Sequence, residues 1–145
     1  LAKPKQIMER QMEEVRASTE IAVLGWSVIL LLAHIVAQAL SLDRDCGIGY
    51  ALSNRDDAKP VSIWTDRLTR GLRNFIETYG AFVALALALV VTGKHGGLGA
   101  TGALVWFWAR VVYVPVFVAG IPVLRTVVWG ASIVGLVMML VRLMS

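Results

Sequence analysis

The sequence has 145 residues, of which 57% are hydrophobic and 17% charged, and its mean hydropathy is +0.69. A soluble domain of this size rarely has such a composition, and the clustering of the apolar residues in long runs favours membrane spans over one soluble core. The net charge is +4 and the pI about 9.6, yet we expect no nucleic-acid partner, because the basic residues lie at the ends of the apolar runs rather than on one soluble face.

Residues 1–20 form a predicted amphipathic N-terminal arm. Apolar residues recur there at helical spacing, among them Ile7, Met8, Met12 and Val15, and acidic and basic side chains alternate around them. This pattern predicts a short helix at the membrane surface, or a collar that runs into the first span. An arm that binds a partner is the alternative.

Four apolar runs follow, and each is long enough to cross a hydrocarbon core of about 30 Å as a helix. The predicted membrane domain covers residues 21–145, with spans at about 21–42, 66–92, 98–119 and 122–143. Because the connections join consecutive helices, we expect an all-α fold, a transmembrane four-helix antiparallel bundle.

The first span and the loop after it carry few chemical groups. His34 and Gln38 lie four residues apart in the span and either form interhelical hydrogen bonds or line a ligand pocket. Residues 43–66 are predicted to be a long loop, which holds Cys46, the single cysteine. One cysteine cannot form an intrachain disulfide, and we predict an incidental thiol and no metal site.

A polar stripe marks the start of the second span. Arg67, Arg70, Asn74 and Glu77 are separated by 3, 4 and 3 residues, which places them within an arc of roughly 80° on a helix. Arg73 lies beside this arc. Such a stripe is costly against lipid, so we expect it to face protein, a cavity or a ligand.

The third span also contains a charge, Arg110, near its centre. An arginine at this depth costs about 2.5–3.5 kcal/mol on translocon-type scales, so it requires a counter-ion or a bound anion. Tyr113 and Phe117 follow on the same face, and Pro115 is expected to kink the helix and open space beside it.

The arginines at or near these spans outnumber Glu77, the one acid predicted within the membrane. In an antiparallel bundle the start of the second span, the end of the third and the start of the fourth, which carries Arg125, lie at one membrane level. The surplus predicts an anionic ligand such as a carboxylate, a phosphate or a thiolate. Two structural alternatives stay open: arginines paired with lipid phosphates, and Arg110 paired with Glu77 or with an acid of a neighbouring subunit.

The spacing of these residues resembles that of a known family. The second span has an arginine, an asparagine four residues later and a glutamate three residues after that, at Arg70, Asn74 and Glu77. The third span adds Arg110 and Tyr113. This pattern resembles the MAPEG family, the membrane-associated proteins of eicosanoid and glutathione metabolism. Two longer stretches are similar to its bacterial members, RNFIET at 73–78 and ARVVYVPVFVAGIPVLRTVVW at 109–129.

The resemblance implies a bundle that assembles as a homotrimer and binds glutathione between subunits. Arg70, Asn74 and Glu77 would then hold the charged ends of the tripeptide, and Tyr113 would contact it from the neighbouring subunit. Arg73 and Phe117 complete the predicted ligand-binding set.

The catalytic group that the resemblance implies is an arginine near the sulfur of glutathione. Arg125 and Arg110 are the two candidates, because positive charge stabilises the thiolate, which is the nucleophile. The chain departs from the family pattern where tyrosines are frequent, at Thr78 and Phe117, and where a hydrogen-bonding residue is frequent, at Leu72.

Two functions from different classes remain at this point. One is a glutathione-dependent transferase or peroxidase acting on lipophilic electrophiles in a bacterial inner membrane. The other is a non-catalytic membrane protein that binds anionic lipid or another small anion in an intersubunit cleft. A proton pathway through Glu77 and His34 is disfavoured, because no chain of acids continues it.

Overall fold

A computed structural model describes residues 4–145. Within these residues the chain is entirely helical and contains no strand, which confirms the predicted all-α class. The helices are α1 (Pro4–Arg16), α2 (Thr19–Cys46), α3 (Ile48–Ala51), α4 (Ile63–Val91), α5 (Gly97–Ala119) and α6 (Pro122–Met144). Four of them, α2, α4, α5 and α6, are long and apolar enough to cross a membrane.

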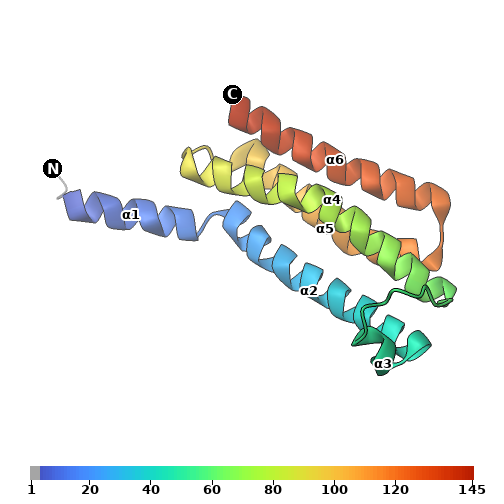
Figure 1. The fold of residues 1–145 in the computed structure, drawn as a ribbon. Coiled ribbons are helices and arrows are strands. Elements are labelled where there is room, and N and C mark those ends of the chain that lie inside the picture. Colours follow the sequence, from blue (N-terminus) through green and yellow to red (C-terminus); the bar gives the residue numbers. More distant parts are fainter. Residues whose placement is uncertain (1–3) are drawn as a thin grey trace.

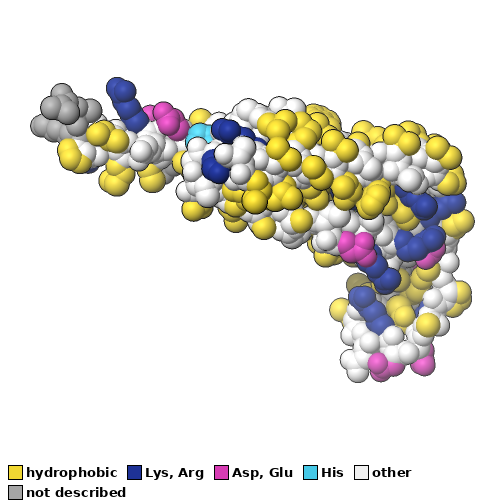
Figure 2. Space-filling view, turned by 90° about the horizontal axis from the view of Figure 1, so that it is seen from above, with side chains coloured by type: hydrophobic (Ala, Val, Ile, Leu, Met, Phe, Trp, Pro, Cys, Tyr) yellow, Lys and Arg dark blue, Asp and Glu magenta, His cyan; other side chains and the backbone are white. Residues whose placement is uncertain are grey.

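The four long helices form the predicted antiparallel bundle (Figure 1). α2 packs against α4 and α5, and α6 packs against α5 and α4. Hydrophobic side chains cover the flank of the bundle seen in Figure 2, whereas lysines and arginines gather at its two ends. This distribution is the one expected of an apolar band with charged groups at the level of the lipid headgroups.

The N-terminal arm is a separate helix, α1, that contacts α2. In both views it extends beyond one end of the bundle rather than along its side (Figures 1 and 2). Ile7, Met8 and Met12 are exposed on it. Residues 1–3 of the predicted arm lie outside the described residues.

The predicted loop at residues 43–66 is shorter in the structure, which corrects the sequence interpretation. α2 continues through the charged residues after position 42 and ends at Gly47, whose φ of 83° breaks the helix. α3 then forms a single turn, and α4 begins after Ser62, whose Oγ accepts the backbone N–H of Thr65 at 3.3 Å. Charged residues mark the end of an apolar run, but they do not end the helix. Beyond the hydrocarbon region their side chains are in water, so the helix can continue through them.

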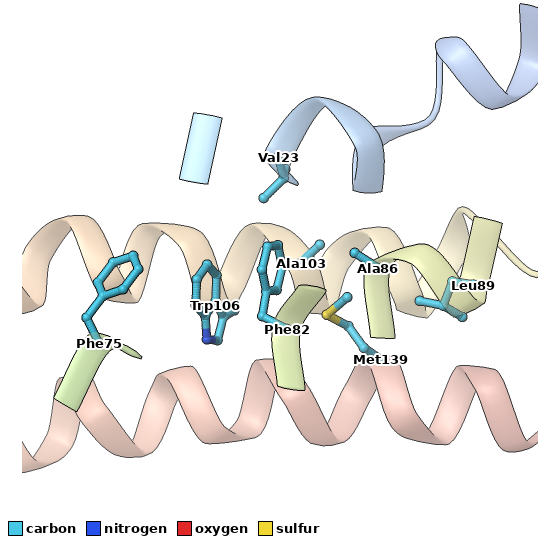
Figure 3. Close-up of a cluster of buried hydrophobic side chains, with 8 residues drawn as sticks. All are labelled: Val23, Phe75, Phe82, Ala86, Leu89, Ala103, Trp106 and Met139. Atoms are coloured by element: carbon cyan, nitrogen blue, oxygen red, sulfur yellow. The ribbon is translucent and has the colours of Figure 1, made fainter. Parts of the chain in front are cut away.

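The core is centred on aromatic rings from α4 and α5. Phe82 and Trp106 stack with centroids 3.8 Å apart, and Phe75 meets Trp106 edge-on at 5.8 Å. Figure 3 shows this cluster, which α2 and α6 also enter; its members are Val23, Phe75, Phe82, Ala86, Leu89, Ala103, Trp106 and Met139. The burial of Phe75 and Phe82 fixes the rotation of α4 and therefore the direction of its polar stripe.

Polar contacts join all four spans at the end of the bundle where α1 leaves it. Glu20 is fully buried, and its Oε1 accepts the backbone N–H of Gly96 at 2.7 Å, before the first turn of α5. Lys94 Nζ donates to the carbonyl of Leu143 at 2.7 Å, and Arg142 Nε donates to the carbonyl of Lys94 at 3.1 Å. Glu20, which the sequence interpretation assigned to the arm, therefore belongs to α2 and stabilises this end.

Candidate functional site

A cleft of about 430 Å³ opens at the other end of the bundle, between α4, α5 and α6. The lining residues are Arg70, Arg73, Asn74 and Glu77 from α4, Tyr113 and Phe117 from α5, and Arg125, Thr126 and Trp129 from α6. Seven of the eight predicted site residues lie here, and the eighth, Arg110, does not line the cleft.

Helical spacing explains how α4 supplies its part of the wall. Arg70, Asn74 and Glu77 lie one turn apart on a single face. Arg67, the first residue of the predicted stripe, does not join them: its Nη1 donates to the carbonyl of Val118 at 2.9 Å, near the end of α5. The residues of the predicted stripe therefore lie in two places. Arg67 forms a hydrogen bond between α4 and α5, and the other three residues line the cleft.

Asp66 is a neighbour of the cleft that pairs with Arg70, a contact that the sequence interpretation did not include. Its Oδ2 accepts a hydrogen bond from Arg70 Nη2 at 2.5 Å, and both side chains are about half exposed. The separation of four residues on one helix is the signal that could have revealed this pair. Asp66 offsets the charge of Arg70, so the surplus in the cleft is carried by Arg73 and Arg125, with Glu77 as the single lining acid.

The α5 wall is aromatic. Tyr113 and Phe117 are 4% and 8% exposed, and their ring centroids lie 5.4 Å apart. The guanidinium carbon of Arg125 lies 5.0 Å from the Phe117 centroid, and that of Arg70 lies 6.0 Å from it. Phe117 therefore holds two cations by cation–π contact. Tyr113 and Asn74 line the same cleft of this chain.

Arg110 is fully buried behind the α4 wall. Its Nη1 donates to Asn74 Oδ1 and its Nη2 to Thr78 Oγ1, both at 2.8 Å. Among residues 4–145 no salt bridge joins Arg110 to Glu77. Within this chain Arg110 thus donates to neutral acceptors and not to Glu77, and Thr78 is a partner that the sequence interpretation did not identify.

Two polar residues of the first span, α2, form hydrogen bonds between helices. His34 Nε2 lies 3.2 Å from the carbonyl of Leu68, and Gln38 Nε2 donates to Thr69 Oγ1 at 3.2 Å. Both bonds join α2 to α4, which agrees with the interhelical alternative. Neither side chain lines the cleft.

The model of the MAPEG family matches residues 21–145, which include all four spans and every cleft residue. The chain belongs to the MAPEG family. It is therefore an integral, multi-pass membrane protein of that family. No curated protein matches the chain.

The family match begins within α2, so α1 lies outside it. As a MAPEG protein the chain keeps the arginine, asparagine and glutamate of α4 in one cleft with Tyr113. The α6 side of that cleft adds Thr126 and Trp129, which the sequence interpretation did not include. Helical spacing from Arg125 places Trp129 one turn further along the same face.

Proposed function

We propose that this MAPEG protein is a glutathione-dependent transferase or peroxidase that acts on lipophilic electrophiles. The observation that carries the proposal is the composition of the cleft, three arginines and one glutamate beside Asn74 and Tyr113. Glutathione carries two carboxylates, one ammonium group and a thiol. Guanidinium groups match the carboxylates and Glu77 matches the ammonium, so the residues present fit this co-substrate.

Arg125 is the residue that we assign to the sulfur. It lines the cleft and lies against Phe117, whereas Arg110 stands behind the wall. A free thiol has a pKa of about 8.5, and a nearby positive charge lowers it, so Arg125 would raise the share of thiolate at neutral pH. The bound thiolate would form a carbon–sulfur bond with an electrophilic carbon, from which a leaving group departs with its electron pair. With a hydroperoxide it would attack the distal oxygen and break the O–O bond, which releases the alcohol after protonation and leaves glutathione sulfenic acid. A second glutathione would convert this acid to glutathione disulfide and water.

The membrane supplies the second substrate in this proposal. Trp129, at the α6 side of the cleft, is 40% exposed, and α6 presents further apolar side chains outward. An apolar electrophile dissolved in the bilayer can reach the cleft along this face. We also propose a homotrimer in a bacterial inner membrane, because the resemblance to bacterial MAPEG members implies that assembly.

Glu77→Gln tests the assignment of the ammonium group. The substitution keeps the shape of the side chain and removes its charge, so we expect the dissociation constant of glutathione to rise about tenfold or more. Isothermal calorimetry on the detergent-purified protein measures this constant. N-acetylated glutathione, which lacks the ammonium, is the control ligand and should bind wild type and variant equally. An unchanged affinity for glutathione would remove Glu77 from this role.

A second function is favoured by the exposure of the cleft mouth. The Arg70 side chain is 55% exposed, and Arg73 is also exposed, so phosphate headgroups of anionic lipids can reach both. In this alternative the protein binds anionic lipid, or another small anion, without catalysis. Mass spectrometry of the purified protein would then find anionic lipid that is lost in Arg70→Ala, whereas equal lipid in both proteins contradicts it.

A further inference from the structure

Arg110 is a buried cation whose hydrogen bonds go to neutral oxygens. Its guanidinium is fully buried and makes no salt bridge within residues 4–145. The guanidinium carbon lies 5.3 Å from the ring centroid of Tyr113 and 6.0 Å from those of Phe75 and Trp106. Three aromatic faces and two neutral oxygens therefore stabilise a charge whose burial is costly. A group placed at such cost, directly behind a ligand cleft, suggests a role in the cleft.

That role follows from the chemistry of the Asn74 amide. A guanidinium group only donates hydrogen bonds, so the atom of Asn74 that meets Arg110 Nη1 at 2.8 Å must be the carbonyl oxygen. The amide nitrogen then lies on the other side, and Asn74 lines the cleft. Within residues 4–145 this nitrogen has no hydrogen-bond partner, and it is not enclosed. Asn74 therefore presents two N–H donors to the cleft.

We propose that Arg110 is a positioning residue, which fixes the Asn74 amide so that the cleft presents a donor to a carboxylate of glutathione. This inference rests on the proposed function. An amide that could turn over would place its oxygen against the carboxylate for part of the time, and the two acceptors would repel each other. Fixing the amide before binding removes that cost, which is how preorganisation raises affinity.

Thr78 is the second anchor of Arg110. Its hydroxyl accepts from Arg110 Nη2 at 2.8 Å and donates to the carbonyl of Phe75 at 3.3 Å. Both hydrogen-bonding roles of the hydroxyl are thus used behind the cleft, and Thr78 does not line it. The two anchors are one helical turn apart on α4, a spacing that the fork of a single guanidinium can span. The threonine that departs from the family pattern gains a function in this arrangement.

The first experiment tests the Arg110–Asn74 contact without any ligand. Asn74→Asp keeps an acceptor oxygen against Arg110 and adds a negative charge. Leucine has a similar size but no acceptor, so Asn74→Leu leaves the guanidinium without this hydrogen bond. We expect the melting temperature of Asn74→Asp in detergent to stay near that of wild type and that of Asn74→Leu to fall by about 5–10 °C. Equal losses in the two variants would overturn the inference.

The second experiment tests whether the anchor acts through Asn74. Thr78→Val removes the second anchor without touching the cleft, and we expect the glutathione dissociation constant to rise about three- to tenfold. Thr78→Ser, which restores the hydroxyl, should recover wild-type affinity. The matched control is Thr92→Val at the other end of α4, where the hydroxyl donates to the carbonyl of Ala88 at 2.7 Å; its affinity should equal that of wild type.

A double-mutant cycle separates positioning from a general effect on the fold. In the background of Asn74→Ala, Thr78→Val should cost no further glutathione affinity, because the amide that it positions is absent. Additive losses would show that Thr78 and Arg110 act independently of Asn74 and would overturn the inference. If wild type does not bind glutathione, the proposed function fails, and the comparison of Asn74→Asp with Asn74→Leu decides the inference about Arg110.

Discussion

Gly135→Ala is expected to lower the free energy of unfolding by about 3 kcal/mol, at the upper end of typical overpacking costs. A Cβ atom at position 135 would lie 2.7 Å from the carbonyl oxygen of Gly102 and 2.7 Å from the backbone nitrogen of Trp106. Both contacts are with backbone atoms of α5, which cannot turn aside as a side chain can. The methyl group must therefore push α5 and α6 apart, in the region where Trp106 packs in the core.

The control for this prediction lies on the same helix. Gly130 is also within α6, but a Cβ atom there meets nothing within 4 Å. Gly130→Ala should therefore leave stability unchanged or raise it by about 0.5–1 kcal/mol through helix propensity. Thermal unfolding of both variants in detergent, followed by circular dichroism, gives the comparison. Equal melting temperatures would contradict the close packing of α5 against α6.

Arg125→Ala is expected to lower glutathione-dependent turnover by about 100- to 1000-fold, the loss seen when one group that stabilises developing or full negative charge is removed. Arg125 is the lining cation on α6, and its guanidinium carbon is held 5.0 Å from the Phe117 centroid. In this position it can stabilise the thiolate without itself forming a covalent bond. The measurement is a steady-state assay with glutathione and a lipophilic electrophile in detergent.

Two observations separate this effect from a loss of structure. Arg125→Lys keeps a positive charge in the cleft and should retain part of the turnover, although a point charge replaces the planar donor. Arg10→Ala removes the same charge from α1, which projects from the other end of the bundle, and should be fully active. Turnover of Arg125→Ala equal to that of Arg10→Ala would exclude the assigned role.

Much of the site was predictable because it rests on helix periodicity. The spacing of Arg70, Asn74 and Glu77 places them on one face whatever surrounds the helix. The antiparallel connection then brings the end of α5 to the same level, which is why Tyr113 and Phe117 lie in the same cleft.

The remaining features depend on the rotation of each helix, which periodicity does not fix. A charge at the centre of a span predicts a counter-ion or a bound anion, whereas within this chain Arg110 donates to two neutral oxygens. Which oxygens these are depends on Phe75 and Trp106, whose contact sets how α4 and α5 face each other. Glu20 was assigned to the arm because the first apolar run begins after it, at Ile21. The structure buries it against the N–H of Gly96, where the start of a helix stabilises a carboxylate.

Calorimetric titration of glutathione into the detergent-purified wild-type protein, with the ultraviolet absorbance of the thiolate recorded in parallel, tests the central claim most directly. The proposed function predicts saturable binding and a thiolate signal near neutral pH, below the ordinary pKa of about 8.5 for a free thiol. Absence of binding at millimolar glutathione would contradict it.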